Sequence, residues 1–170
     1  MERSPNKPGF EIARLGEHTV QEVVELALLA WEPVFAEWER LLGSTLFAAA
    51  ISTDWRQSHG DSVAKACRDE NNATWIAVAD NRVAGFIIYR LDDEKRTGEV
   101  QMLAVHPSFQ NQGIGTALNR FALDKFREAG MTVATVWTGG DAGHAPARKS
   151  YEKAGYVPLP TVRYYQTLDD

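Results

Sequence analysis

Two glycines, Gly113 and Gly115, stand in the segment QNQGIG, which follows an apolar run and precedes a predicted helix. The first turn of a helix has backbone N–H groups without partners inside the helix, and the helix dipole adds partial positive charge there. Such a turn binds anions, and glycine lets a phosphate approach the main chain closely. The segment therefore predicts a phosphate-binding loop. The alternative from these residues alone is a turn whose glycines only bend the chain.

Two common nucleotide-binding motifs do not fit this loop. The dinucleotide fingerprint needs a third glycine at position 118, which is Leu118, and an acidic residue about 20 positions further on. That neighbourhood is Val133–Val136, which has no acidic residue. A P-loop needs Gly-Lys-Ser or Gly-Lys-Thr, and no such triplet follows the glycines. Neither motif therefore explains the loop.

A longer segment around the glycines, LAVHPSFQNQGIGTAL, resembles motif A of the GNAT superfamily, the acetyl-CoA-dependent N-acetyltransferases. The core of that motif is Arg/Gln-x-x-Gly-x-Gly/Ala, which Gln110, Gly113 and Gly115 match. A second segment, ARKSYEKAGY, resembles the family's Ala-x-x-x-Tyr-Glu-Lys-x-Gly-Phe helix. One predicted helix and one predicted strand separate the two segments, as the family requires. The clear resemblance covers residues 99–156.

The resemblance implies acetyl-CoA as a cosubstrate and indicates which residues hold it. The loop amides would bind the CoA pyrophosphate, and the pantetheine arm would pair with the backbone of the preceding strand. The family often has an asparagine seven residues before its tyrosine, and His144 stands at that place. The implied CoA-binding residues are Leu103, Ala104, Val105, Gln110, Asn111, Gln112, Gly113, Ile114, Gly115, Thr116 and His144.

Two residues are candidates for proton transfer. Acetyl transfer needs a base, because an ammonium must lose a proton before it attacks, and an acid for the CoA thiolate. The resemblance implies that Tyr151 is the acid and that Glu99, on the strand before the loop, is the base. The alternatives are a core tyrosine and an exposed glutamate at a strand start. Regular alternation places Glu99, Gln101, Leu103 and Val105 on one strand face and Val100, Met102 and Ala104 on the other.

Apolar periodicity predicts the elements that must position these residues. The predicted strands cover residues 10–15, 74–79, 83–91, 99–105, 132–137 and 163–168. A helix begins at Thr19 and is expected to kink or restart at Pro33, and residues 44–70 are helical or irregular. A further helix is predicted to follow Gly115, and another to cover residues 144–154. This order predicts an α/β or α+β fold, and the resemblance implies a GNAT fold with a mixed, mostly antiparallel sheet of six to seven strands.

The chain of 170 residues suits a single domain. We divide it into a loose tail (1–9), an acceptor-side strand and helices (10–72), a CoA-binding core (73–156) and a C-terminal strand (157–170). The net charge of −5 argues against broad nucleic-acid binding. The histidines lack paired-ligand spacing and Cys67 is the single cysteine, so no metal site is expected.

The sequence also bears on the compartment. It begins without the apolar segment of a signal peptide, and no apolar run reaches the ~18 residues of a membrane span. With a single cysteine, this predicts a cytoplasmic protein without a membrane partner.

We therefore predict an N-acetyltransferase that moves the acetyl group of acetyl-CoA to a primary amine by direct attack in a ternary complex. The alternatives are a transferase for a different acyl-CoA, a non-catalytic acyl-CoA-binding sensor, and a plain interaction domain. The acceptor would be a small-molecule or peptide amine, and its identity depends on residues 16–72 and 157–170, which hold no motif. Homodimers are frequent in the family, so a homodimer is compatible with the resemblance.

Overall fold

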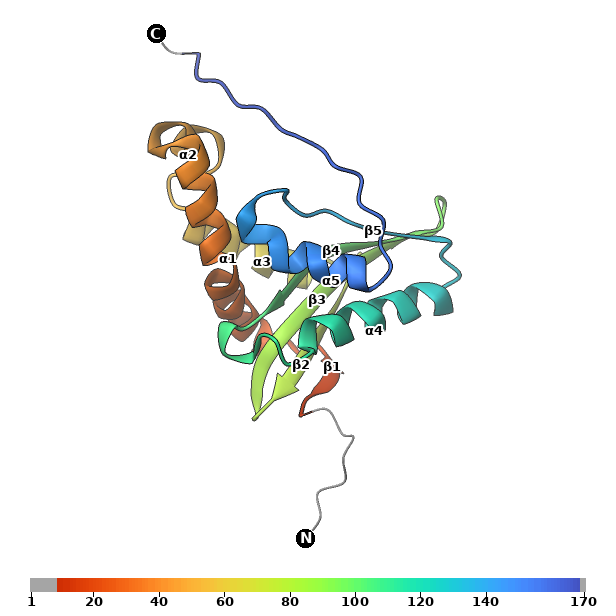
Figure 1. The fold of residues 1–170 in the computed structure, drawn as a ribbon. Helices are drawn as coiled ribbons and strands as arrows, with labels where there is room; N and C mark the ends of the chain where they lie inside the picture. The colour runs from red at the N-terminus through yellow and green to blue at the C-terminus, as the bar shows by residue number, and fades with distance from the viewer. Residues whose placement is uncertain (1–8, 169–170) are drawn as a thin grey trace.

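A five-stranded sheet forms the centre of residues 9–168, the part of the chain that the computed structural model describes (Figure 1). The strands lie in the order β1-β2-β3-β4-β5, and all neighbours are antiparallel except β4 and β5, which are parallel. This confirms the predicted fold class, although not the strand count. The strands are β1 (Glu11–Arg14), β2 (Asn72–Ala79), β3 (Arg82–Asp92), β4 (Thr97–Val105) and β5 (Val133–Val136).

Helices cover both faces of the sheet, because each turns one apolar side toward it. On one face, α1 and α3 enclose a core that includes Phe86 and Ile88. On the other face, α4 packs over a core that includes Leu118 and Phe126, with α5 beside α4 (Figure 1). The helices are α1 (Val20–Leu42), α2 (Ser44–Ala50), α3 (Trp55–Arg68), α4 (Ile114–Glu128) and α5 (Ala145–Lys153). None of these described helices is long and apolar enough to cross a membrane.

A tight turn at Asp80 and Asn81 joins β2 to β3, as the sequence predicts. Both residues have positive φ, 50° and 57°. Two successive residues with positive φ are typical of a type I′ turn, whose twist matches that of the strands it connects. The hairpin places β3 in the middle of the sheet, where Val83–Tyr89 are all buried.

The expected restart of the first helix at Pro33 is wrong, because α1 continues through this residue from Val20 to Leu42. Proline removes one N–H from the helix ladder, which costs stability. Buried residues on both sides, Leu26 and Ala27 before it and Val34 and Phe35 after it, hold the two halves against the same core. Tertiary packing therefore outweighs the local penalty.

The predicted strand at 163–168 is also wrong. No described residue after Lys153 belongs to a helix or strand, so the sheet has five strands rather than six or seven. A strand requires a neighbour that pairs its N–H and C=O groups, and this segment runs away from the sheet (Figure 1). Its alternating apolar side chains are consequently exposed, among them Val157, Leu159, Val162, Tyr164 and Leu168.

β4 has a bulge at Gln101, where its pairing with β3 skips one residue. A bulge shifts the alternation of side chains by one position. The predicted set of faces for this strand is therefore wrong, because Val100 changes sides. The side chains of Val100, Leu103 and Val105 lie toward α4, and those of Met102 and Ala104 lie toward α1.

β4 and β5 separate halfway along β4. The parallel pairing begins at Thr97 with Val133 and ends at Val100 with Val136. Beyond Val100, the remaining half of β4 has no strand partner on this side among the described residues. The sheet therefore opens beside residues 101–105, and the backbone groups on that edge are free to pair with a ligand.

Candidate active site

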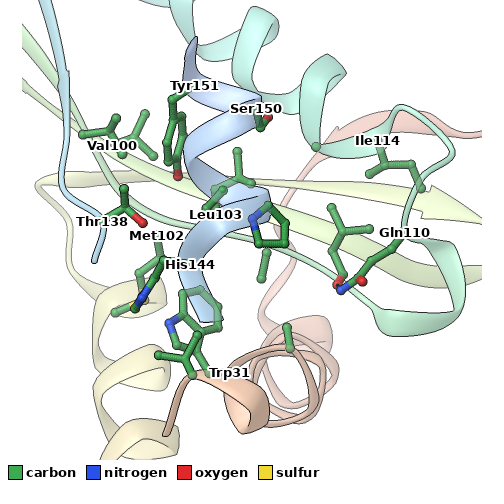
Figure 2. A pocket seen from close by; sticks show the side chains of 18 of the residues that line it. Trp31, Val100, Met102, Leu103, Gln110, Ile114, Thr138, His144, Ser150 and Tyr151 are labelled. Carbon is green, nitrogen blue, oxygen red and sulfur yellow. The ribbon is translucent and has the colours of Figure 1, made fainter. Parts of the chain in front are cut away.

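The unpaired half of β4 borders a cavity of about 550 Å³ (Figure 2). Residues 100–105 of β4 form one wall, and α4, α5 and α1 contribute the others. In Figure 2, Gln110 and Ile114 lie at one side of the cavity, and Thr138 and His144 lie at the other. We call the side formed by residues 110–116 the loop end, and the side formed by Thr138 and His144 the histidine end.

The loop end has the backbone geometry that the glycine pattern predicts. Gly113 is the N-cap of α4 and adopts a left-handed conformation, with φ of 83°. Asn111 also has positive φ, 61°. No side chain caps the helix start, so the N–H groups of residues 114–116 have no capping partner. These amides are available to an anion at the wall of the cavity.

Gly115 lies beside the end of β4. A Cβ atom there would lie 3.4 Å from Val105 Cγ2 and 3.9 Å from Leu103 Cδ2. Gln110 donates a side-chain hydrogen bond to the Val105 carbonyl at 3.2 Å, which ties the loop to the end of the strand. The first turn of α4 and the free edge of β4 therefore meet in one cavity.

Most of the predicted CoA-binding residues line this cavity. They are Leu103, Ala104, Val105, Gln110, Asn111, Gly113, Ile114, Gly115, Thr116 and His144. Gln112 is the exception, since it is not among the lining residues and its side-chain amide donates to the Ser108 carbonyl at 3.3 Å.

Tyr151 reaches the cavity from α5 and is only 7% exposed. Its ring contacts that of Tyr156 edge-on, with 5.7 Å between centroids. Burial, with a smaller contribution from Tyr156, raises the pKa of the Tyr151 hydroxyl above its usual range. The hydroxyl therefore keeps its proton at neutral pH and can donate it. Figure 2 shows this hydroxyl pointing into the cavity.

Glu99, the predicted base, lies in the part of β4 that pairs with strands on both sides. It pairs with Arg90 of β3 and Thr135 of β5 in the closed part of the sheet, and it is half-buried. It is not among the residues that line the cavity. The bulge at Gln101 explains this, because it separates the register of Glu99 from that of Leu103 and Val105.

His144 and Asp141 form a hydrogen-bonded pair at the histidine end. His144 Nδ1 lies 2.7 Å from Asp141 Oδ2, and the side chains are only 13% and 9% exposed. Trp38 of α1 donates its indole N–H to the same Oδ2 at 3.1 Å, and the His144 amide donates to Oδ1 at 3.2 Å. Burial alone would raise the pKa of the Asp141 carboxyl, but the hydrogen bonds from His144 and Trp38 outweigh it, so this pKa is lowered. Asp141 is therefore a carboxylate at neutral pH.

The contact between Trp38 and Asp141 has no direct signal in the sequence, because the two residues are 103 positions apart. One local signal was available: an aspartate three residues before His144 is typical of a helix cap, and Asp141 caps the short 3₁₀ turn η3 (Ala142–His144). The aromatic residues of α1 and α3 complete this end of the cavity. Trp31 contacts His59 with 5.0 Å between ring centroids, and both line the cavity. Burial lowers the pKa of His59, which favours its neutral form.

Comparison with known proteins agrees with this geometry. Residues 23–156 match the model of the acetyltransferase (GNAT) family. The chain is 30% identical over 116 residues to the mycothiol acetyltransferase of Sanguibacter keddieii, an alignment that covers 68% of this chain and 34% of that protein. The chain thus spans about a third of that relative's length.

Two solved structures share the fold. The ribosomal-protein-S18-alanine N-acetyltransferase of Escherichia coli has a TM-score of 0.66 at 18% identity, covering 94% of this chain and 85% of that one. The PaiA N-acetyltransferase of Thermoplasma acidophilum, in complex with coenzyme A, has a TM-score of 0.65 at 16% identity, covering 90% and 92%. The family match spans most of the chain and includes strands β2 to β5, the loop and the cavity described above. The chain therefore belongs to the GNAT acetyltransferase family and is an acyltransferase.

Proposed function

We propose that this protein transfers the acetyl group of acetyl-CoA to a primary amine by direct attack in a ternary complex. The observation that carries the proposal is the meeting of three features in one cavity: the uncapped first turn of α4, the unpaired half of β4, and the buried hydroxyl of Tyr151. An anion site, a strand edge and a proton donor are the parts that a CoA thioester requires.

The chain's own groups suit the two polar parts of acetyl-CoA. The amides of residues 114–116, with the positive end of the α4 dipole, would bind the diphosphate. The free backbone groups of residues 101–105 would pair with the amides of the pantetheine arm. When bound, acetyl-CoA supplies the thioester carbonyl that the amine attacks.

Tyr151 is the proposed acid. In the reaction the neutral amine nitrogen forms a bond to the carbonyl carbon, the carbon–sulfur bond breaks, and the nitrogen gives one proton to the base. The sulfur leaves with the electron pair and takes the proton of the Tyr151 hydroxyl, and the tyrosinate then regains a proton from solvent while the base releases one to it. Because burial keeps this hydroxyl protonated, the acid is present over the whole neutral range.

Glu99 stays the family-based prediction for the base. Its position in the closed part of the sheet, outside the lining of the cavity, means that a proton would reach it only through intervening water. Mutation of Glu99 to Gln tests this role directly.

We propose that the acceptor is a small-molecule or peptide amine that enters beside α1 and α3. The cavity is lined there by Ala30, Trp31, Val34 and His59. The first three side chains carry no charge, and burial lowers the pKa of His59, which favours its neutral form. The relatives are named for mycothiol and for an alanine of a ribosomal protein, which are both compatible with such an acceptor. Because the chain has a single cysteine, Cys67, it cannot form an internal disulfide, and a reducing compartment remains our expectation.

The experiment is a screen for release of the CoA thiol from acetyl-CoA against a fixed panel: an alanine-initiated peptide, a lysine peptide, glucosamine, spermidine and an aminoglycoside. We expect one class to be acetylated, with the product confirmed by mass spectrometry. A protein whose melting temperature rises with CoA but which releases no thiol with any amine would be the non-catalytic sensor instead. Propionyl-CoA and succinyl-CoA, run on the same panel, test the alternative of a different acyl chain.

A further inference from the structure

We propose that His144 is the catalytic base of acetyl transfer and that Asp141 is its positioning residue. The inference rests on the proposed function and names the group that removes the proton from the attacking amine. It gives His144 a role different from the CoA contact that the sequence resemblance implies.

The hydrogen bonds of Asp141 fix the tautomer of the imidazole. A carboxylate can only accept, so the proton between Asp141 Oδ2 and His144 Nδ1 belongs to the histidine when the ring is neutral. The lone pair is then on Nε2, which has no hydrogen-bond partner within residues 9–168. The ring faces the cavity, so this lone pair is available to a substrate proton.

The surroundings hold the pair rigidly. Trp38 donates to Asp141 and its ring lies 5.7 Å from that of His144, so α1 supports both residues. Arg148 of α5 donates to the carbonyls of Gly139 and Asp141 at 2.6 Å each, which fixes the loop that carries the pair. A Cβ atom at Gly139 would collide with Asp141 Oδ2 and His144 Nδ1. Only glycine at 139 leaves the hydrogen bond undisturbed.

Position within the cavity also favours His144. It stands seven residues before Tyr151, which is two helical turns or roughly 10 Å along the axis. Two full turns place both residues on the same side of α5, and both line the cavity. His144 contacts Trp38 of α1 at the end of the cavity away from the loop. Glu99 has no comparable access.

The charged groups around the ring are few. Asp141 faces it from η3, and Arg148 of α5 has its guanidinium engaged by two backbone carbonyls. Glu37 of α1 lies near Asp141 and is paired with Arg40 at 2.7 Å. His59 of α3 shares the cavity. The charge in direct contact with the ring is thus the Asp141 carboxylate.

The kinetic test uses His144→Asn, which keeps an amide donor toward Asp141 but has no base. With the amine acetylated fastest in the panel, we expect kcat/KM at pH 7 to fall by about 10²–10⁴-fold, with CoA binding changed little. An amine that is already neutral needs no deprotonation before it attacks, so the deficit should narrow at least about tenfold as the pH rises to the amine's own pKa, about 8 for a peptide N-terminus and about 10 for an alkyl amine. A structural role would give the same deficit at every pH, and that result would overturn the inference. So would the pH-dependent loss appearing in Glu99→Gln and not in His144→Asn.

A second measurement does not depend on turnover. Nitrogen-15 NMR of the imidazole in the unliganded protein should show neutral His144 as the Nδ1–H tautomer, and Asp141→Asn should shift this balance. A neutral ring found with its proton on Nε2 would refute the proposed orientation even if the protein acetylates amines. A wild-type protein without turnover on the panel, but with the Nδ1–H tautomer, would refute the proposed function while the orientation stood.

Discussion

The two ends of the cavity offer a ligand different chemical groups, backbone amides at one end and side chains at the other. At the loop end, the groups offered to a ligand are backbone amides, and their direction is set by φ angles at Asn111 and Gly113. At the histidine end they are side chains, and their direction is set by hydrogen bonds among Trp38, Asp141 and His144. The first arrangement is contained in one short segment, whereas the second joins α1 to a loop about a hundred residues later.

This difference separates two kinds of function. Backbone amides offer the same chemistry whatever the neighbouring side chains are, so the loop end suits a cosubstrate that never changes. Side chains can be exchanged one at a time, so the histidine end suits proton transfer and the choice of acceptor. Each prediction below perturbs one end while a matched variant leaves it intact.

The largest of the following effects is expected at Tyr151, the proposed acid that protonates the leaving sulfur. Tyr151→Phe keeps the ring and removes the proton donor, so kcat should fall by about 10²-fold or more while CoA affinity changes little. Tyr156→Phe is the matched control, because Tyr156 contacts the same ring but does not line the cavity. Steady-state kinetics with both variants measures this. Equal activity of Tyr151→Phe and wild type would remove the acid from the mechanism.

The next effect concerns the loop end alone. Gly113→Ala and Gly130→Ala place a Cβ at φ of 83° and 76°, and neither Cβ meets an atom within 4 Å. Both should therefore lose a similar stability, about 1–2 kcal/mol, in urea unfolding. Only Gly113→Ala should weaken CoA binding, by about tenfold or more in calorimetry, which corresponds to ~1.4 kcal/mol. CoA affinity lowered equally in both variants would argue against the loop as the anion site.

A smaller effect distinguishes two adjacent glycines at the histidine end. Gly139→Ala pushes a methyl group against the Asp141–His144 hydrogen bond, whereas a Cβ at Gly140 meets nothing within 4 Å. We expect kcat/KM at pH 7 to drop by roughly tenfold in Gly139→Ala, a part of the general-base contribution, and to stay unchanged in Gly140→Ala. CoA affinity should be the same in both. If Gly140→Ala lost as much activity, the loop backbone rather than the pair would be responsible.

The smallest effect is a change in alkaline stability. Burial raises the pKa of Tyr156 to about 12, and its hydroxyl has no hydrogen-bond partner within the described residues. A folded-state pKa above the unfolded value of about 10 gives stability that is complete below pH 10 and is lost as pH rises toward 12. Urea unfolding between pH 8 and 11.5 should therefore show a shallower decline for Tyr156→Phe than for wild type. Parallel curves would contradict the predicted shift.

The backbone geometry of the loop end could be predicted from the sequence because its determinants are local. Gly113 and Gly115 define the helix start, Asp80 and Asn81 define a hairpin, and each signal is complete within a few residues. The bulge at Gln101 was not predictable, since it depends on how β3 and β4 pair. It places Val100 on the α4 side of the sheet, and Glu99 is not among the residues that line the cavity. The prediction of a strand at 163–168 was wrong for the same reason. The segment has alternating apolar residues, but no described strand pairs with it.

The histidine end shows a further limit. His144 was predicted at the cavity from its place in a motif, and it lines the cavity. Its chemistry could not be predicted, because Asp141 and Trp38 give it a tautomer and a fixed direction only in the folded chain.

Gly139 restricts which residues can occur together at positions 139, 141 and 144. Since a methyl group at 139 and the Asp141–His144 bond cannot occupy the same space, the residue at 139 is free to diversify only in descendants that have already given up the pair. Homologous chains with a side chain at this position should therefore lack aspartate or histidine at the other two, and those that retain both should carry glycine. A single absent carbon atom would then mark, in aligned sequences, which members of the family abstract the substrate proton in this way.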